Sequence, residues 1–199
     1  MSTESPSTVD ILRRVIAGRR SIKPSEFRED PIPDDMIHDM LNNANWAPTH
    51  GMTEPWRFFV FCGDARRRLG EFLADVYDGM TPPELRKPAK GDQLISNACR
   101  SSHVIAIAMR RQVSEKIPEL EEIEAVACAV QNLHLTATAY GIGGYWSSGA
   151  AICSSAFRDH LGLGEKDRVL GLFYLGYPAN GWPQGSRTPF KDKVTWLHE

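Results

Sequence analysis

The sequence has few cysteines, and neither they nor its histidines have the spacing of a disulfide framework or a metal site. Four cysteines are spread over 199 residues without a CxxC pair: Cys62, Cys99, Cys128 and Cys153. We interpret them as reduced core thiols of a protein from a reducing compartment, which predicts a cytoplasmic location. The six histidines form no HExxH pair and have no cysteine partners at zinc spacing. No metal site is therefore expected.

Other familiar signatures are also missing. No apolar run is long enough to cross a membrane, and residues 1–8 hold Ser, Thr and Pro where a signal peptide has an apolar core. There is no GxSxG nucleophile elbow, so a hydrolase triad is not expected. The net charge of -2 provides no field that would recruit nucleic acid or an anionic membrane. We therefore expect neither a membrane nor a nucleic-acid partner.

The sequence that is present has the composition of a globular protein. The apolar fraction is 42% and the charged fraction 24%, which are ordinary values. A chain of 199 residues can bury a real core. We expect a flexible tail at residues 1–7 and a single domain at residues 8–199.

The spacing of apolar residues predicts an α+β fold, in which helices surround a small sheet. Helices are expected at residues 8–18, 34–44, 65–77, 93–100, 118–140 and 155–161, and strands at residues 56–61, 103–109 and 169–177. The helix at 118–140 is the longest, and its small residues allow both sides to pack closely, so we place it centrally. Residues 79–91 contain prolines and no periodicity, which indicates a lid-like excursion that shapes substrate access.

A basic cluster follows the first helix. Arg19, Arg20 and Ser21 place two guanidinium groups and a hydroxyl within three residues, a combination that suits a phosphate monoester. The alternative is that both arginines cap the last carbonyls of the helix. Lys23 lies two residues further on, where its ammonium could stabilise an anionic reduced ring or could simply be solvated.

Residues 45–61 combine a turn-rich loop with a core strand. The loop carries three hydrogen-bonding side chains, Thr49, His50 and Thr53. A rigid loop that leads into a buried strand is a common place to hold a flat ligand. The alternative is a plain connection between a helix and a strand.

Residues 141–149 are rich in glycine and follow the long helix. Glycines let the backbone approach a ligand closely, and this run could present an N–H such as that of Ser148 to an acceptor. The order of helix, glycines and strand does not fit the GxGxxG dinucleotide fingerprint, which lies between a strand and a helix. A glycine-rich turn without a ligand is the alternative.

Taken together, these segments resemble the FMN-dependent nitroreductase family over about residues 8–199. The blocks that carry the resemblance are residues 19–21, 47–50, 54–58, 140–144, 146–149 and 171–176, in that order. The Ala-Pro-x-His and Gly-Gly-x-Trp forms are most similar to those of the small, single-domain YdjA-like members. The resemblance implies a nitroreductase-like fold with a small, mostly antiparallel or mixed sheet. It also implies an intertwined homodimer with two FMN sites in the interface, each built from both chains.

The resemblance implies ten FMN contacts: Arg19, Arg20, Ser21, Lys23, Trp46, His50, Trp146, Ser147, Ser148 and Arg187. The first three would hold the phosphate and ribityl chain, and Arg187 would complete the phosphate site. Lys23 would reach the N1/C2 carbonyl side of the ring. The turn-rich loop of residues 45–55, which we call the opening loop, would contribute Trp46 and His50, and residues 146–148 would run along the isoalloxazine with a backbone N–H near N5.

The end of the long helix matches a segment assigned to nicotinamide-nucleotide binding: Thr136, Ala137, Thr138, Ala139, Tyr140 and Gly141. The implied activity is ping-pong reduction of a nitroaromatic, quinone or similar small acceptor by NADH or NADPH, and the flavin carries the chemistry without a catalytic side chain. The alternatives are a flavin storage or delivery protein, a specialised family member that dehydrogenates or dehalogenates its substrate, and an interaction domain without a cofactor.

The chain departs from the family in the opening loop. Many members have Asn-x-Gln-Pro-Trp where this chain has Met52, Thr53 and Glu54 before Pro55 and Trp56. Methionine cannot provide the amide hydrogen bonds that asparagine gives to the pyrimidine edge of the flavin. The acceptor and the preference for NADH or NADPH are not predicted.

Overall fold

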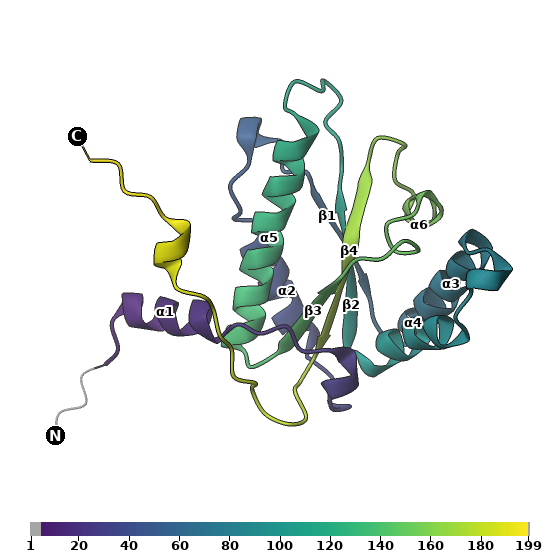
Figure 1. Cartoon of the computed structure of the whole chain (residues 1–199), viewed down its shortest axis with the longest axis horizontal. Coiled ribbons are helices and arrows are strands. Elements are labelled where there is room, and N and C mark those ends of the chain that lie inside the picture. Colours follow the sequence, from purple (N-terminus) through teal and green to yellow (C-terminus); the bar gives the residue numbers. More distant parts are fainter. Residues whose placement is uncertain (1–4, 199) are drawn as a thin grey trace.

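The computed structural model describes residues 5–198, apart from the side chain of Pro88 (Figure 1). The helices and strands are α1 (Thr8–Gly18), α2 (Asp34–Ala44), β1 (Trp56–Phe61), α3 (Asp64–Met80), α4 (Pro88–Arg100), β2 (His103–Met109), α5 (Glu119–Ala139), β3 (Gly143–Ser147), α6 (Ser155–His160) and β4 (Arg168–Gly176). Of the predicted tail at residues 1–7, residues 1–4 lie outside the described residues. Ser7 caps α1, because its Oγ accepts a hydrogen bond from the Asp10 N–H at 3.2 Å.

The four strands of the described chain form one sheet in the order β1-β2-β4-β3, and every neighbouring pair is antiparallel. The sheet therefore confirms the predicted α+β class with a small antiparallel sheet. A bulge interrupts the β2–β4 register between Ile107 and Ala108, opposite Gly171, whose φ is +147°. β3 is an edge strand of this sheet, and this position matters for the site.

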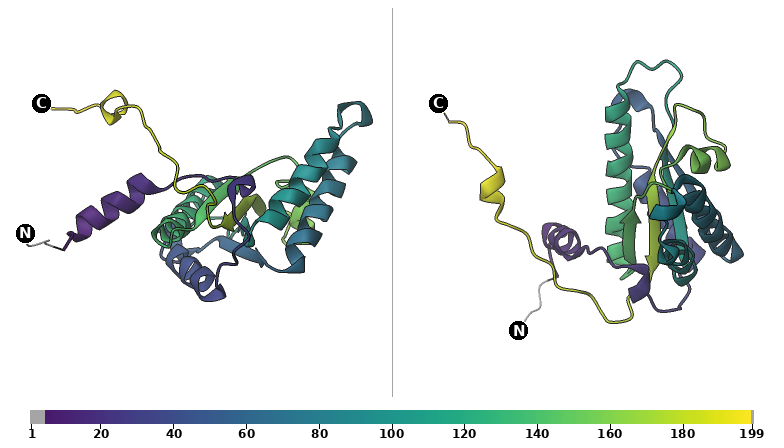
Figure 2. Two further views of the ribbon diagram at one scale, coloured as in Figure 1. Left: turned by 90° about the horizontal axis from the view of Figure 1, so that it is seen from below. Right: turned by 45° about the vertical axis from the view of Figure 1, so that its right-hand side comes forward.

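Helices cover both faces of the sheet, as Figures 1 and 2 show. The helices α2 and α5 pack on one face, and α3, α4 and α6 pack on the other. The alternation along β2 explains this arrangement, since Ile105, Ile107 and Met109 face the first layer. Val104, Ala106 and Ala108 face the second. A strand buried on both faces needs consecutive apolar residues, which β2 provides from Val104 to Met109.

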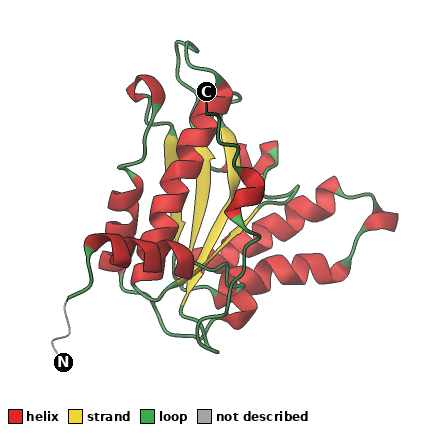
Figure 3. Ribbon diagram, turned by 60° about the vertical axis from the view of Figure 1, so that its left-hand side comes forward, coloured by secondary structure: helices red, strands yellow, loops and turns green. Residues whose placement is uncertain are grey.

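Two segments extend away from this body, namely α1 and the chain after β4 (Figures 1 and 2), and Figure 3 views the molecule from the side on which they project. No residue of α1 is buried, although the helix carries the apolar side chains Val9, Leu12 and Ile16. Residues 178–198 form an extended arm with one short 3₁₀ turn, Phe190–Lys193. Large apolar side chains on this arm are also exposed, among them Trp196 and Leu197.

The structure corrects the prediction for residues 79–91. Helix α3 continues to Met80 and α4 already begins at Pro88, so only residues 81–87 form the connection, which includes a 3₁₀ turn at Pro83–Leu85. Proline fits the first turn of a helix, where its missing N–H has no partner to lose. Close packing stabilises the pair, because a Cβ on Gly70 of α3 would lie 2.7 Å from the Ile95 Cα of α4.

The prediction that the cysteines are core thiols is also wrong. Cys62, Cys128 and Cys153 are exposed, and Cys99 is half-buried. All four are free thiols, as expected. Their wide spacing in the sequence carried no information about burial. Within residues 5–198, no helix combines the length and apolar character needed to span a bilayer.

Candidate functional site

The segment after α1 lies against the free edge of the sheet. Ser21 forms a parallel bridge with Gly144 of β3, and the Ile22 N–H donates to the Gly144 carbonyl at 3.1 Å. Only glycine fits at position 144, because a Cβ there would lie 2.5 Å from the ring of Phe173. Thus the basic cluster and the glycine-rich run, which are more than 100 residues apart in sequence, meet at one edge of the sheet.

Three guanidinium groups gather next to this bridge. A cavity of about 530 Å³, which we call the arginine cavity, is lined by Ile16, Ala17, Arg19, Arg20, Gln131, Gly185, Ser186 and Arg187. The pKa of Arg19 is lowered by burial and by the nearby charges of Arg187 and Arg20. In the described chain, no carboxylate lies within ion-pair distance of these three arginines. Repelling cations without a counter-ion are an arrangement that suits an anionic ligand.

The three arginines differ in how the protein already uses them. Arg20 Nη1 donates to the carbonyls of Ala17 and Arg19, at 2.8 and 2.7 Å, so this side chain caps α1 as the alternative reading proposed. Arg20 Nε donates to the Pro183 carbonyl at 3.1 Å and so ties the C-terminal arm to the cluster. Arg187 donates only to the Ser186 carbonyl next to it. The charges of Arg19 and Arg187 are therefore the more available ones.

The free edge of β3 leads away from the arginine cavity. Because the Gly144 carbonyl faces Ile22 rather than β4, the alternation of an antiparallel strand turns the backbone groups of Trp146 outward as well. Ser148 comes directly after β3, roughly 13 Å from Gly144 at 3.3 Å per residue. The Trp146 indole packs on β4, where its Nε1 donates to the Leu170 carbonyl at 3.1 Å.

A second, smaller cavity lies where β3 ends. It has a volume of about 200 Å³ and is lined by Tyr77, Lys90, Gln93, Leu94, Asn97, Tyr145, Ser147, Ser148, Gly149, Ala150, Ala151, Ile152 and Tyr174. We call it the β3-end cavity. The side chains of Lys90, Gln93 and Asn97 bring hydrogen-bond donors from α4 to the predicted residues Ser147 and Ser148. Sequence reasoning missed these three residues, since no motif marks them and only the packing of α4 brings them here.

The opening loop begins at the C-terminal end of α2 and does not line the arginine cavity. Its Trp46 is 81% exposed, and His50 Nδ1 lies 2.5 Å from an oxygen of Glu121 in the first turn of α5. The arginine cavity lies near the other end of the same helix, where His134 contacts Arg20. Glu121 and His134 are thirteen positions apart along the helix, which corresponds to roughly 20 Å. Within one chain, His50 therefore lies away from the arginine cavity, and Trp46 is not among the residues that line it.

The two departures in this loop occupy unusual backbone positions. Met52 and Glu54 both have positive φ values, +52° and +42°. The Glu54 N–H donates to Thr49 Oγ1 at 3.3 Å, and Thr49 and Thr53 join their hydroxyls at 3.1 Å. The Met52 side chain is exposed. The loop is thus held by its own threonines, and its exposed side chains project from the chain.

Other predicted residues lie at the ends of elements. Lys23 is exposed just before the 3₁₀ turn Pro24–Glu26. In the predicted nicotinamide segment, Thr136 accepts a hydrogen bond from Asn43 Nδ2 of α2, and Ala137 is fully buried. Thr138 bonds within α5, Ala139 is exposed, the Tyr140 hydroxyl donates to Asp39, and Gly141 ends the helix with a φ of +71°. None of the six lines the arginine cavity, and nicotinamide binding by this segment stays a prediction.

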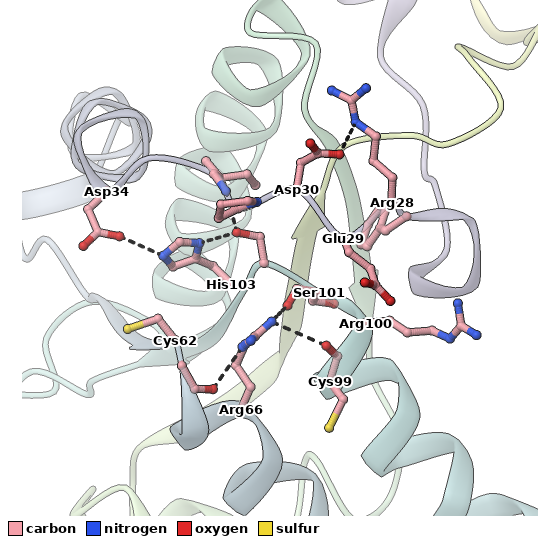
Figure 4. A pocket seen from close by; sticks show the side chains of 15 residues that line it. Arg28, Glu29, Asp30, Asp34, Cys62, Arg66, Cys99, Arg100, Ser101 and His103 are labelled. Atoms are coloured by element: carbon pink, nitrogen blue, oxygen red, sulfur yellow. Dashed lines mark hydrogen bonds and ion pairs between the residues drawn. The ribbon is translucent and has the colours of Figure 1, made fainter.

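A third cavity, of about 700 Å³, is not part of this arrangement (Figure 4). Its polar groups bind one another: His103 Nε2 lies 3.1 Å from Asp34, its Nδ1 lies 3.1 Å from Ser102 Oγ, and Ser102 Oγ accepts from the Ile32 N–H at 2.7 Å. Arg66 donates to backbone carbonyls of Gly63, Cys99 and Ser101. This network fastens the start of α2 to β2. Within residues 5–198 no group of acidic, histidine and cysteine side chains could hold a metal ion.

Comparison with known proteins gives concordant results. The model of the nitroreductase family matches residues 16–177. The chain is 30% identical over 166 residues to YdjA of Escherichia coli strain K12, whose name classes it with the NAD(P)H nitroreductases, and the match covers 82% of this chain and 86% of YdjA. The crystal structure of a nitroreductase-like family protein from Bacillus cereus has a TM-score of 0.81 at 26% identity, with 100% of both chains covered. The FMN-dependent nitroreductase NfnB from Mycobacterium smegmatis, solved in complex with NADPH, has a TM-score of 0.76 at 19% identity, with 96% of this chain and 100% of NfnB covered.

Proposed function

Because this chain belongs to the nitroreductase family, we propose that it is an FMN-dependent oxidoreductase that uses NADH or NADPH to reduce nitroaromatics, quinones or similar small acceptors. The names of YdjA and NfnB support the two cofactors, and the site in this chain supports the way in which FMN would bind. The observation that carries the proposal is the cluster of three arginines without a carboxylate partner, placed at the head of the free edge of β3.

The arginine cavity is the proposed phosphate site. Arg19 and Arg187 offer guanidinium groups that match phosphate oxygens, and binding a dianion there would relieve the repulsion between them. Ser21 adds a hydroxyl beside the same cavity, at the bridge to Gly144. The phosphate would therefore gain both charge and hydrogen bonds.

The ring would lie further along β3. The outward N–H of Trp146, and that of Ser148 just beyond β3, would face its central nitrogens, and Lys23 would face the N1/C2 carbonyl side. In the β3-end cavity, Gln93 and Asn97 carry amides that can pair with the pyrimidine edge, a role for which Met52 lacks the groups. When bound, FMN would supply ping-pong hydride transfer from the nicotinamide to the acceptor. The protein would supply binding, orientation and exclusion of water.

We propose that Trp46 and His50 reach FMN from a second copy of the chain. Within one chain His50 lies far from the arginine cavity and Trp46 does not line it, and α1 and the C-terminal arm expose apolar side chains that a partner would cover. The apolar side chains are exposed on both segments next to the site, which favours a homodimer with FMN in the interface. Sedimentation at micromolar concentration should give the mass of two chains. A monomer that binds FMN fully would contradict the shared site.

The test of the function combines colour, turnover and one matched pair of variants. Purified protein is expected to be yellow, and its flavin should bleach when NADH or NADPH is added and recover with a quinone or nitroaromatic. Arg187→Ala should weaken FMN binding by about tenfold or more, since a hydrogen bond to a charged group contributes roughly 1.5–3 kcal/mol. Arg68→Ala, on the exposed side of α3, is the control and should bind FMN normally.

Two outcomes would contradict the proposal in different ways. Protein that stays colourless and inactive after FMN is added would refute the cofactor. Bound flavin that stays oxidised with both nicotinamide nucleotides would retain the cofactor but replace reductase turnover with flavin storage or delivery.

A further inference from the structure

A buried histidine of α5 lies directly beneath the basic cluster. His134 is 6% exposed, and its Nε2 lies 3.0 Å from the Arg20 carbonyl oxygen. A carbonyl only accepts, so Nε2 must carry the hydrogen and donate it. The ring also meets Phe173 of β4 edge-on, with 4.9 Å between centroids and 79° between planes. The imidazole is therefore fixed in position, in orientation and in tautomer.

The carbonyl that His134 holds belongs to the peptide between Arg20 and Ser21. In the chain, this peptide follows Arg19 and leads directly into the bridge from Ser21 to Gly144. Since a trans peptide points its C=O and N–H in opposite directions, holding this carbonyl against α5 turns the Ser21 N–H away from the protein interior. The hydrogen bond thus sets the rotation of the backbone that carries the phosphate-binding groups.

We propose that His134 is a positioning residue of the phosphate site, whose Nε2–H fixes the backbone from which Arg19 and Ser21 reach the phosphate of FMN. The inference rests on the proposed function, because it assumes that a phosphate occupies the arginine cavity. His134 does not line that cavity and acts through the Arg20 carbonyl.

The chemistry of the ring suits this role. Two effects lower the pKa of His134 to about 4: burial is the larger, and the charge of Arg19 is the smaller. The ring is therefore neutral at physiological pH. A neutral donor holds the carbonyl without adding a fourth cation to the cluster. Its volume matters too, because a Cβ on Gly144 would lie 3.0 Å from His134 Nε2. A ring that only filled this space would also pack well, so the experiment must separate the hydrogen bond from the volume.

Two substitutions and two flavins make that separation. His134→Gln keeps an N–H donor, and His134→Leu keeps apolar volume without one. Apoprotein is titrated with FMN and with riboflavin, which lacks the phosphate, and the quenching of flavin fluorescence gives each Kd. His134→Leu should weaken FMN binding about three- to tenfold, the range of one hydrogen bond, and should leave riboflavin binding unchanged. His134→Gln should bind FMN within about twofold of the wild type, a difference well below that of one hydrogen bond.

The opposite results identify which idea fails. Equal losses for the two flavins, or equal losses for the two variants, would reduce His134 to a core-filling residue. Unchanged FMN binding by His134→Leu would remove its role while leaving the proposed function intact. Wild-type protein that binds no FMN would instead overturn the proposed function and this inference with it.

A measurement on the wild type covers the case in which His134→Leu does not fold. In nitrogen NMR spectra of the apoprotein, the Nε2–H resonance of His134 should be protected from exchange. It should shift when FMN is added and stay in place with riboflavin. A resonance that responds equally to the two flavins would refute a link to the phosphate.

Discussion

Mild acid is expected to destabilise this protein through His134, and the size of the effect follows from its surroundings. The folded state lowers the pKa of the ring from 6.5 to about 4, chiefly because burial disfavours the charged form. Between pH 4 and pH 6.5, His134 is protonated in the unfolded chain but stays neutral in the folded chain. Stability is therefore complete above pH 6.5 and is lost as the pH falls towards 4.

The magnitude can be worked out from the two pKa values. One pKa unit corresponds to about 1.4 kcal/mol, so the loss is about 2 kcal/mol at pH 5 and about 3 kcal/mol at pH 4. Losses of this size are large against a total stability of roughly 5–15 kcal/mol. His103 adds to the loss in the same direction, because burial also lowers its pKa. The contribution of His134 must therefore be isolated by substitution.

The assay is urea unfolding of wild type and His134→Gln at pH 7.5 and pH 5, at one protein concentration. Glutamine does not titrate, so the variant should lose about 2 kcal/mol less than the wild type between the two pH values. His38→Gln, on the exposed side of α2, serves as the control and should follow the wild type. If wild type and His134→Gln lose equal stability on acidification, folding does not lower the pKa of His134 and the reasoning fails.

Two further predictions concern the frame around the site, and both are read from urea unfolding at neutral pH. Gly171→Ala should lower the free energy of unfolding by roughly 2 kcal/mol or more, because φ is +147° and a Cβ would lie 2.3 Å from the Trp146 indole nitrogen. The control Gly79→Ala in α3 meets nothing within 4 Å and should be neutral or stabilising. Equal effects of the two substitutions would show that the bulge tolerates a side chain. Glu122→Gln should lower the free energy of unfolding by roughly 3 kcal/mol, since it leaves the Arg111 cation without its buried partner. The control Glu124→Gln, on the exposed side of α5, should change stability by less than about 0.5 kcal/mol. If Glu122→Gln is neutral, solvent reaches the ion pair.

Three of the strands and the first two helices were the most predictable parts of the fold, whereas β3 was expected only as a strand after the glycines of residues 141–149. β1 and β2 have the bounds that their apolar runs predict, and β4 differs by one residue at each end. Strands buried by helices on both sides need uninterrupted apolar sequence, and this requirement is visible locally. The ends of α3 and α4 were not predictable in the same way. Their last and first turns are stabilised by contact between the two helices, at places such as Gly70, which periodicity within either helix does not reveal.

The site was predictable in its chemistry but not in its assembly. The residue types of Arg19, Arg20 and Ser21 indicate an anion, whatever the fold. Their meeting with Gly144 and Arg187 depends on a β-bridge and on the path of the C-terminal arm, both of which are long-range contacts. His134 could not be identified from sequence, since a lone histidine on a helix is usually a core or surface residue. Only its distance from the Arg20 carbonyl gives it a role.

The contacts between α1 and the C-terminal arm have a consequence for the biogenesis of the protein. The hydrogen bonds from Arg20 to Pro183 and from Trp182 to Gly18 join positions 163 and 164 residues apart. Contacts of such separation form late, because the chain between them must be ordered first. During synthesis the arginine cavity cannot close until residue 187 has left the ribosome and the arm has folded back. The nascent protein therefore lacks a complete arginine cavity, and FMN whose phosphate binds there, as proposed, would be loaded only after residue 187 has been added.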